Sequence, residues 1–310
     1  MNYLLIIGGL FLLVLGGNWL LKGAVSLSLK LEIPKIIIGM TVVSFATSAP
    51  ELIVSINAAL NNSSDLALGN VIGSNIANLG LVLGVTLLFG KIQVQKGFYI
   101  TDWPVVMIAS VLLFLFLKND NLISNLEGLI MITLLIIFLI YLLKFNKTTV
   151  EEELTEEDQG LSLYKIILLL SIGGISLWGG SELLIKGATS LAKAFGVTER
   201  VIGVTLVSIG TSIPELAASI IAVLKKEKAI SLGNLLGSNI FNIFAVLGIT
   251  SIITPIKVVD ERLINHDIFW MLGISFIILP LVFMPKRFRL DWKHGIILLL
   301  AYLTFIYFTI

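Results

Sequence analysis

Two long segments of this chain repeat each other, and each places a glutamate inside an apolar stretch. Residues 39–52 read GMTVVSFATSAPEL, and residues 203–216 read GVTLVSIGTSIPEL. A second pair follows at the same offset, with LGNVIGSNIANLGLVLG at 68–84 and LGNLLGSNIFNIFAVLG at 232–248. Every matched residue lies 164 positions after its counterpart, without a gap. An internal repeat in a hydrophobic chain indicates a transporter built from two related halves.

Composition places the chain in a lipid bilayer. Of its 310 residues, 57% are hydrophobic and 13% are charged, whereas a soluble domain carries about twice that charged fraction. A net charge of +1 excludes the electrostatic footprint of a nucleic-acid-binding protein. The absence of cysteine excludes disulfides, thiolate metal sites and cysteine nucleophiles. We expect the bilayer as a partner and no nucleic acid, and the sequence leaves the oligomeric state open.

The apolar residues predict the number of membrane spans. A spanning helix needs about 20 mostly apolar residues. Ten stretches satisfy this: 2–28, 34–60, 66–90, 98–117, 122–145, 161–190, 197–224, 229–254, 263–284 and 292–310. We therefore predict an all-α membrane protein with ten transmembrane helices in two five-helix repeats, 1–145 and 161–310. The acidic segment 146–160 is predicted to be a cytoplasmic linker between them.

Five spans per half is an odd number, so the second repeat is predicted to be inverted relative to the first. Loop charges predict the orientation, because basic residues concentrate in cytoplasmic loops. One set of loops carries Lys30, Lys35, Lys91, Lys96, Lys144, Lys147, Lys165, Lys225, Lys226, Lys228, Lys286, Arg287, Arg289 and Lys293. The opposite set carries only Lys118, Lys193, Arg200, Lys257 and Arg262. This asymmetry predicts both termini outside, in the cell (plasma) membrane.

Polar residues inside the spans form stripes. In the first half they are Ser44, Thr47, Ser48 and Glu51, then Asn70, Ser74 and Asn78; in the second half they are Ser208, Thr211, Ser212 and Glu215, then Asn234, Ser238 and Asn242. Spacings of three and four place each set on one helix face. Oxygen-only ligand sets suit hard cations such as sodium and calcium. A single intramembrane glutamate could be a hydrogen-bonded structural group, and the asparagines could join helices, but duplication of the whole frame favours an ion site.

A proline precedes each glutamate. Within a helix, Pro50 and Pro214 lack an N–H and clash with the carbonyls of Ala46 and Gly210. Freed carbonyls at membrane depth are tolerated beside protein or a water-filled cavity, and they can serve as cation ligands.

At these residues the chain resembles the cation/calcium exchanger superfamily. ATSAPEL with GNVIGSNIAN, and GTSIPEL with GNLLGSNIFN, are similar to its two alpha-repeats, and the sodium/calcium exchanger branch is the nearest. Proton/calcium members usually show Gly-Asn-x-x-Glu where this chain has Thr-Ser-x-Pro-Glu. Potassium-dependent members typically carry Asp at the position of Asn242, so the asparagine argues against potassium dependence.

The resemblance implies a central ion site formed by helices 2, 3, 7 and 8, with Glu51 and Glu215 as the main calcium ligands. The other implied ligands are Thr47, Ser48, Ser74, Asn78, Thr211, Ser212, Ser238 and Asn242. It also implies three sodium ions for each calcium. Sodium and calcium are the transported ions, and no cofactor is implied.

The expected function is secondary active exchange of sodium for calcium by alternating access. Two buried carboxylates carry a charge of −2, which is very unfavourable unless cations neutralise it. The carrier is therefore expected to cross its closed state only when loaded, and the long glycine-containing helices 1 and 6 are the expected sliding element. A proton/calcium antiporter and a cation channel are the alternatives. No His-Glu-x-x-His or Gly-x-Ser-x-Gly motif occurs, so the chain is not expected to be an enzyme.

Overall fold

The chain is almost entirely helical in the computed structural model, which describes residues 2–145, 161–195, 208–285 and 287–309. The helices of the first half are α1 (Asn2–Leu31), α2 (Lys35–Ile38), α3 (Ser44–Thr47), α4 (Ala49–Leu60), α5 (Ser64–Ala77), α6 (Leu83–Phe89), α7 (Trp103–Asp120) and α8 (Asn125–Phe145). Those of the second half are α9 (Leu163–Ala194), α11 (Ser208–Gly210), α12 (Ile213–Leu224), α13 (Lys228–Phe241), α14 (Gly248–Ile253), α15 (Ile268–Phe283) and α16 (Trp292–Thr309).

Short π-helical segments join several of these helices. They are η1 (Gly39–Val43), η2 (Asn78–Val82), η3 (Phe98–Asp102), η5 (Asn242–Leu247) and η6 (Leu263–Asp267). Segments η2 and η5 begin at residues 164 positions apart, so the two halves share this irregularity. The sequence does not predict the π-helical segments, because nothing in an apolar helical pattern marks one extra residue in a turn.

Within the described residues, eight helices are long and apolar enough to cross a membrane, and the bent helix 35–60 makes a ninth. This agrees with nine of the ten predicted spans. The remaining span, 197–224, is described only from Ser208, as α11 and the short helix α12. Residues 197–207 and the predicted linker 146–160 lie outside the described residues.

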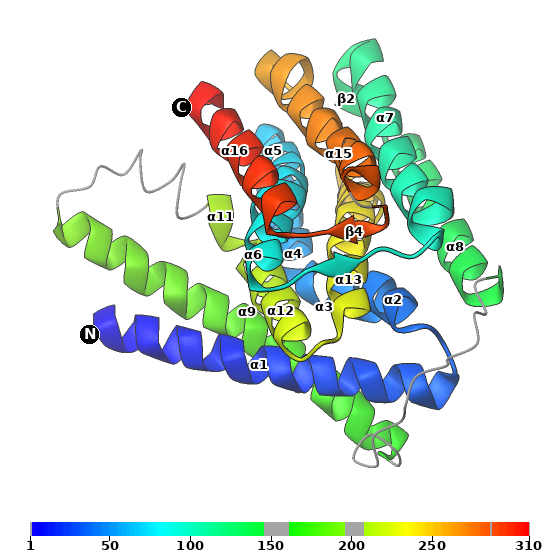
Figure 1. Cartoon of the computed structure of the whole chain (residues 1–310). Helices are drawn as coiled ribbons and strands as arrows, with labels where there is room; N and C mark the ends of the chain where they lie inside the picture. The colour runs from blue at the N-terminus through cyan, green and yellow to red at the C-terminus, as the bar shows by residue number, and fades with distance from the viewer. Residues whose placement is uncertain (1, 146–160, 196–207, 286, 310) are drawn as a thin grey trace.

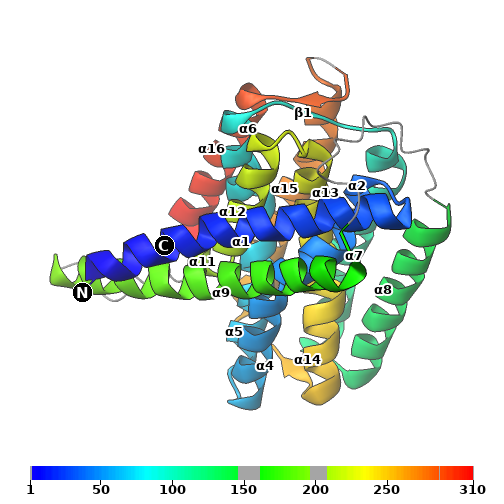
Figure 2. The ribbon, with the colours of Figure 1, turned by 90° about the horizontal axis from the view of Figure 1, so that it is seen from below.

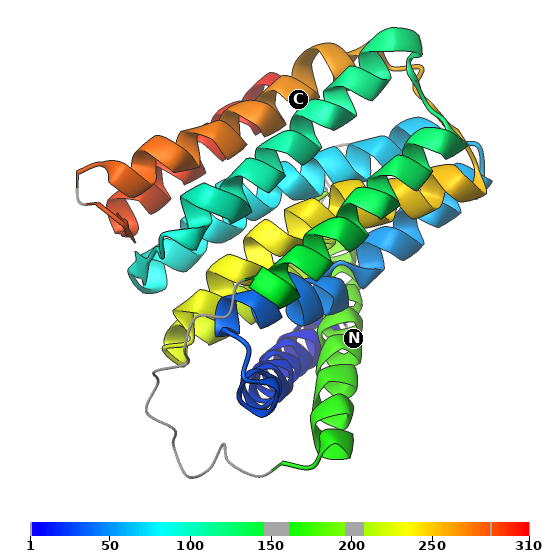
Figure 3. The ribbon, with the colours of Figure 1, turned by 90° about the vertical axis from the view of Figure 1, so that its right-hand side faces the viewer.

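The helices form a bundle that is crossed on one side by a helix pair. Figure 1 shows α1 and α9 running beneath the other helices, and Figure 2 shows the two lying side by side across the bundle. In Figure 3, α1 is seen nearly end-on while α7, α13 and α15 run across the view. The pair is therefore a separate layer, steeply inclined to the bundle.

Glycines allow α1 and α9 to approach closely. A Cβ on Gly16 would lie 2.9 Å from the carbonyl oxygen of Gly173, and a Cβ on Gly180 would lie 2.9 Å from that of Gly9. Gly187 lies beside Asn2, at the other helix's start, so the helices run antiparallel. Close backbone approach of this kind stabilises helix pairs in lipid. The seam repeats every seven residues on both helices: Gly9, Gly16 and Gly23, then Gly173, Gly180 and Gly187.

Two short strand pairs tie the halves together at the helix connections. Strand β1 (Ile92–Gln93) pairs antiparallel with β4 (Arg289–Leu290), with Ile92 opposite Leu290. Strand β2 (Leu122–Ile123) pairs antiparallel with β3 (Ile256–Lys257), with Leu122 opposite Lys257. Each pair takes one strand from each half, so the connections of one repeat are held by those of the other.

The outer surface is apolar. Leu126, Leu129, Ile136 and Ile137 on α8 are all at least half exposed, as are many large apolar side chains on α1, α9 and α16. Extensive exposed apolar surface marks a protein that contacts lipid. The most deeply buried helices, α5–α6 and α13–α14, instead carry polar residues into the centre.

Candidate ion-binding site

Both glutamates stand at helix breaks in the centre of the bundle. The helix that contains Glu51 bends by 45° between α3 and α4, and Ser48 at the break has ψ near 1°. Ser212 has almost the same conformation before α12. The sequence predicted that the prolines lie inside continuous helices, and this prediction is wrong. They lie in the first turn of a new helix, where the missing N–H costs nothing.

This break places each carboxylate near the positive end of a helix. Glu51 and Glu215 lie in the first turns of α4 and α12, where unpaired backbone N–H groups favour negative charge. Both glutamates are fully buried. The carbonyl of Gly210 is one of the two that the sequence predicted to be free. It accepts a hydrogen bond from the Ser181 hydroxyl on α9 at 2.8 Å, so a cation cannot bind it on the side of that hydroxyl.

Hydroxyl groups from one half meet partners from the other. Thr47 Oγ1 lies 3.3 Å from Ser238 Oγ, and Ser74 Oγ lies 3.1 Å from Thr211 Oγ1. These two pairs are equivalent, since each residue lies 164 positions from its counterpart. Ser48 and Ser238 both donate to Oε1 of Glu215, at 3.5 Å, which is the long limit of a hydrogen bond. The structure therefore brings hydroxyls from both halves to one place.

The site's most telling feature is a set of buried oxygen atoms that accept no hydrogen bond from any described residue. Buried polar atoms are nearly always hydrogen-bonded, so each exception needs an explanation. The unpartnered atoms on predicted site residues are Oε1 and Oε2 of Glu51, Oε2 of Glu215, Oδ1 of Asn78 and of Asn242, and Oγ of Ser212. All are oxygens, and carboxylate, amide and hydroxyl oxygens are the ligands that hard cations take.

Two asparagines that were not among the predicted site residues also lie at this centre. Asn75 and Asn239 are buried beside Asn78 and Asn242 and hydrogen-bond to them across the two halves. Their signal was present, because both are the Asn of the repeated Gly-Ser-Asn-Ile motif. It was missed because they lie off the face shared by residues spaced four apart. The described residues hold no group of three or more His, Cys, Asp or Glu side chains that could bind a metal, so any cation here relies on neutral oxygens as well.

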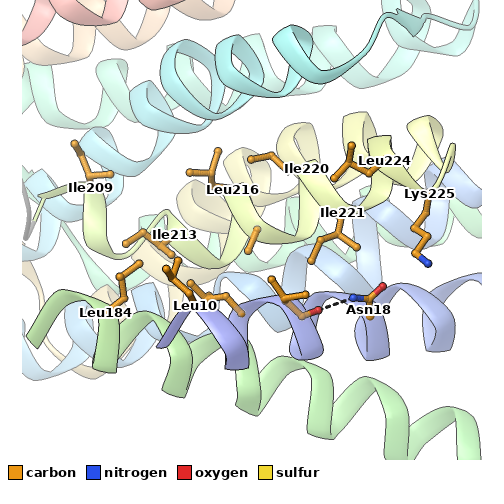
Figure 4. A pocket seen from close by; sticks show the side chains of 13 residues that line it. Leu10, Asn18, Leu184, Ile209, Ile213, Leu216, Ile220, Ile221, Leu224 and Lys225 are labelled. Carbon is orange, nitrogen blue, oxygen red and sulfur yellow. Dashed lines mark hydrogen bonds between the residues drawn. The ribbon is translucent and has the colours of Figure 1, made fainter. Parts of the chain in front are cut away.

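A separate apolar groove lies between the helix pair and the bundle. It encloses about 560 Å³ and is lined by α1, α9, α11 and α12. Figure 4 shows Leu10, Leu184, Ile213 and Leu216 around it, with Asn18 and Lys225 toward one end. Its lining offers almost no oxygen, so it is not a cation site. It separates α1 from α12 over part of their length.

Comparison with known proteins shows the family of the chain. The family model described as "Sodium/calcium exchanger protein" matches residues 1–144 and 165–310. The chain belongs to this family.

Individual members are similar over nearly the whole length. The inner membrane protein YrbG of Escherichia coli is 36% identical over 281 residues, covering 88% of this chain and 86% of the relative. Sodium/calcium exchanger MaX1 of Methanosarcina acetivorans is 30% identical, covering 98% of this chain and 97% of the relative. The structure of sodium-calcium exchanger NCX_Mj soaked with zero Na+ and Ca2+ superposes with a TM-score of 0.83 at 28% identity, covering 100% of this chain and 99% of the other.

Membership of the exchanger family assigns the chain to a class. It is an integral membrane transporter of the cation/calcium exchanger superfamily. The apolar outer surface and the helices long enough to span the bilayer agree with this class.

Proposed function

We propose that this chain exchanges sodium for calcium across a membrane by alternating access at the central site. The observation that carries the proposal is the pair of fully buried carboxylates surrounded by unpartnered oxygens from both halves. A bound cation satisfies these oxygens and neutralises the carboxylates at the same time. Complete burial of Glu51 and Glu215 also favours a carrier over a channel, since a channel needs a continuous open path.

The proposed ligands divide into two kinds. Glu51 and Glu215 supply the charge that a divalent cation requires. Their neutral companions complete the coordination, because calcium takes six to eight oxygens. We propose these as Thr47, Ser48, Ser74, Asn78, Thr211, Ser212, Ser238 and Asn242.

Charge balance explains why exchange is obligatory. Two carboxylates without a cation leave an uncompensated charge in a low-dielectric site, which costs several kcal/mol for each ion even after relaxation. One calcium or two sodium ions remove this cost, so the loaded carrier can close, and a third sodium ion leaves a net charge of +1. Because both ions use the same carboxylates, each displaces the other.

The proposed architecture is ten transmembrane helices in two inverted repeats, with both termini outside in the plasma membrane. The antiparallel pair α1 and α9 supports the inversion, because these are the equivalent first helices of the two halves. Glycines hold α1 and α9 close together as one unit. This pair is therefore a candidate for the element that moves against the bundle.

Transport in proteoliposomes tests the function. An outward sodium gradient should drive calcium-45 uptake. Potassium should not be required, because Asn242 is neutral where potassium-dependent members typically carry Asp. With three sodium ions exchanged for each calcium, uptake should rise when the interior is made positive, since each cycle exports one positive charge. Moving a unit charge through 100 mV is worth about 2.3 kcal/mol. Calcium exchange that ignores sodium and voltage but follows a pH gradient would replace this proposal with proton/calcium antiport.

Cysteine labelling tests the orientation. The chain has no cysteine, so single cysteines can be placed at Asn61 and Lys225, which are exposed at equivalent turns of the two repeats. An impermeant maleimide applied from outside intact cells should label Asn61→Cys and leave Lys225→Cys unlabelled. The reverse pattern would overturn the proposed topology.

A further inference from the structure

Asn75 on α5 and Asn239 on α13 face each other where the two repeats meet. Asn75 Nδ2 donates to the backbone carbonyl of Asn239 at 3.2 Å, and Asn239 Nδ2 donates to the backbone carbonyl of Asn75 at 3.1 Å. Both side chains are 1% exposed. They form a closed, reciprocal pair of contacts between equivalent residues.

These contacts determine how each amide is turned. A backbone carbonyl can only accept a hydrogen bond, so the NH2 end of Asn75 must face Asn239, and the reverse holds for Asn239. The amide oxygen of each side chain must then point the other way.

The orientation passes to the residues three positions on. Asn78 Nδ2 donates to Asn239 Oδ1 at 3.1 Å, and Asn242 Nδ2 donates to Asn75 Oδ1 at 3.1 Å. An amide oxygen only accepts, so Asn78 and Asn242 must present their NH2 ends to it. The remaining atom of each, Oδ1, is buried and has no partner among the described residues.

We infer that Asn75 and Asn239 are positioning residues that turn the amide oxygens of Asn242 and Asn78, respectively, toward the cation. The inference rests on the proposed ion site. A flipped amide would direct its partly positive NH2 group at the cation and oppose binding. Each positioning residue therefore acts on a ligand from the opposite repeat, which joins the two halves of the site.

Crossed double-mutant cycles test this pairing. Calcium affinity of the purified chain is measured by titration calorimetry, and sodium-driven calcium-45 uptake gives KM and the maximal rate. Asn239→Leu should weaken calcium affinity about tenfold, which corresponds to roughly 1.4 kcal/mol. It should raise KM in proportion and leave the maximal rate nearly unchanged.

Two background variants, Asn78→Asp and Asn242→Asp, add the same charge to the site. They distinguish a positioning role from a general loss of structure around the site. In the Asn78→Asp background, a carboxylate presents oxygen whichever way it turns, so Asn239→Leu should cost less than about twofold. In the Asn242→Asp background, the full tenfold loss should remain. Asn75→Leu should show the opposite pattern. Asn239→Ser, with a smaller polar side chain, repeats the test if the leucine variant does not fold.

The outcomes are distinct. Equal losses in both aspartate backgrounds would overturn the orienting role and leave the ion site in place. Failure of the native chain to bind calcium would overturn the proposed function, and the ligand role on which this inference rests would go with it.

Discussion

The two repeats carry nearly the same motifs, yet they pack differently around the site. Thr47 and Asn234, on one side of it, are essentially buried, at 0% and 1% exposed. Their counterparts, Thr211 and Asn70, are only half-buried. Among the described residues, the site is therefore covered more completely on the side of the α12–α13 turn than on the side of the α4–α5 turn.

Close packing of η1 against α13 covers the site on the side of the α12–α13 turn. Gly39 and Gly237 let the backbones of η1 and α13 touch, because a Cβ on Gly39 would lie 2.6 Å from the carbonyl oxygen of Ile230, and one on Gly237 would lie 2.6 Å from Met40 Cα. A Cβ on Gly73, the counterpart of Gly237, would meet no described atom within 4 Å. Among the described residues, Gly237 is therefore in close contact with a neighbouring helix and its counterpart Gly73 is not.

An ion pair closes the same side. Lys35 at the start of α2 lies 2.9 Å from a carboxylate oxygen of Glu227, which precedes α13. The position equivalent to Glu227 in the first repeat is Ser63, which carries no charge. Among the described residues, nearly equal motifs therefore give unequal packing.

The largest effect is expected where the two repeats are equal. Glu51→Gln and Glu215→Gln should each reduce calcium exchange to background with the fold kept, because each removes half of the site's negative charge. Calcium-45 uptake and thermal unfolding in detergent measure the two properties. Glu261→Gln is the control, because Glu261 is exposed in a connection. Near-native uptake in either variant would show that the substituted glutamate is not an essential calcium ligand.

The next largest effect is expected from alanine substitutions at Gly237 and at its counterpart Gly73. Gly237→Ala should lower stability by about 1–3 kcal/mol, because the methyl group overlaps Met40 and forces the backbones apart. Gly73→Ala should be neutral or stabilising by up to about 1 kcal/mol, since alanine favours helix. It should still slow exchange if α5 is tightly packed in the opposite state. Equal melting temperatures for the two variants would show that the packing difference is not a property of the protein in solution.

A smaller effect is expected from the ion pair. Lys35 and Glu227 are partly exposed, so the pair contributes only about 0.5–1 kcal/mol to closure. Lys35→Ala should then speed maleimide labelling of a reporter, Met40→Cys, by about two- to fivefold. Met40 is 1% exposed and lies on η1, where it packs against Gly237 of α13. Exchanging the charges, with Lys35→Glu and Glu227→Lys together, should restore slow labelling; unchanged labelling in Lys35→Ala would show that the pair does not help to cover the site.

An effect of similar size is expected from a contact that only the second repeat makes. Ser181→Ala removes the donor to the Gly210 carbonyl and should cost about 0.5–1.5 kcal/mol of stability. Ser171→Ala, at an exposed position of the same helix, is the control for the change in helix propensity. If the two variants melt at the same temperature, the Ser181 contact does not support the helix break.

Most of the candidate site could be predicted from the sequence because a charged residue inside an apolar span is costly and stands out. Duplication then selected the same oxygen-bearing residues twice. The sequence did not reveal Asn75 and Asn239 as members, since their importance lies in contacts across the repeats. Nor did it place the prolines in the first turns of new helices, because a proline is compatible with either a kink or a fresh start.

The sequence by itself determined the membrane-embedded class, the positions of most spans, the two-repeat organisation and the carboxylates, since these follow from hydropathy and from identity between segments. Only the tertiary structure decided which amide oxygens are buried without a partner among the described residues and which of the described glycines are in close contact. Two nearly identical motifs cannot encode different packing locally. The difference arises from how each motif meets the rest of the bundle, where Gly237 touches Met40 and Gly73 meets no described atom.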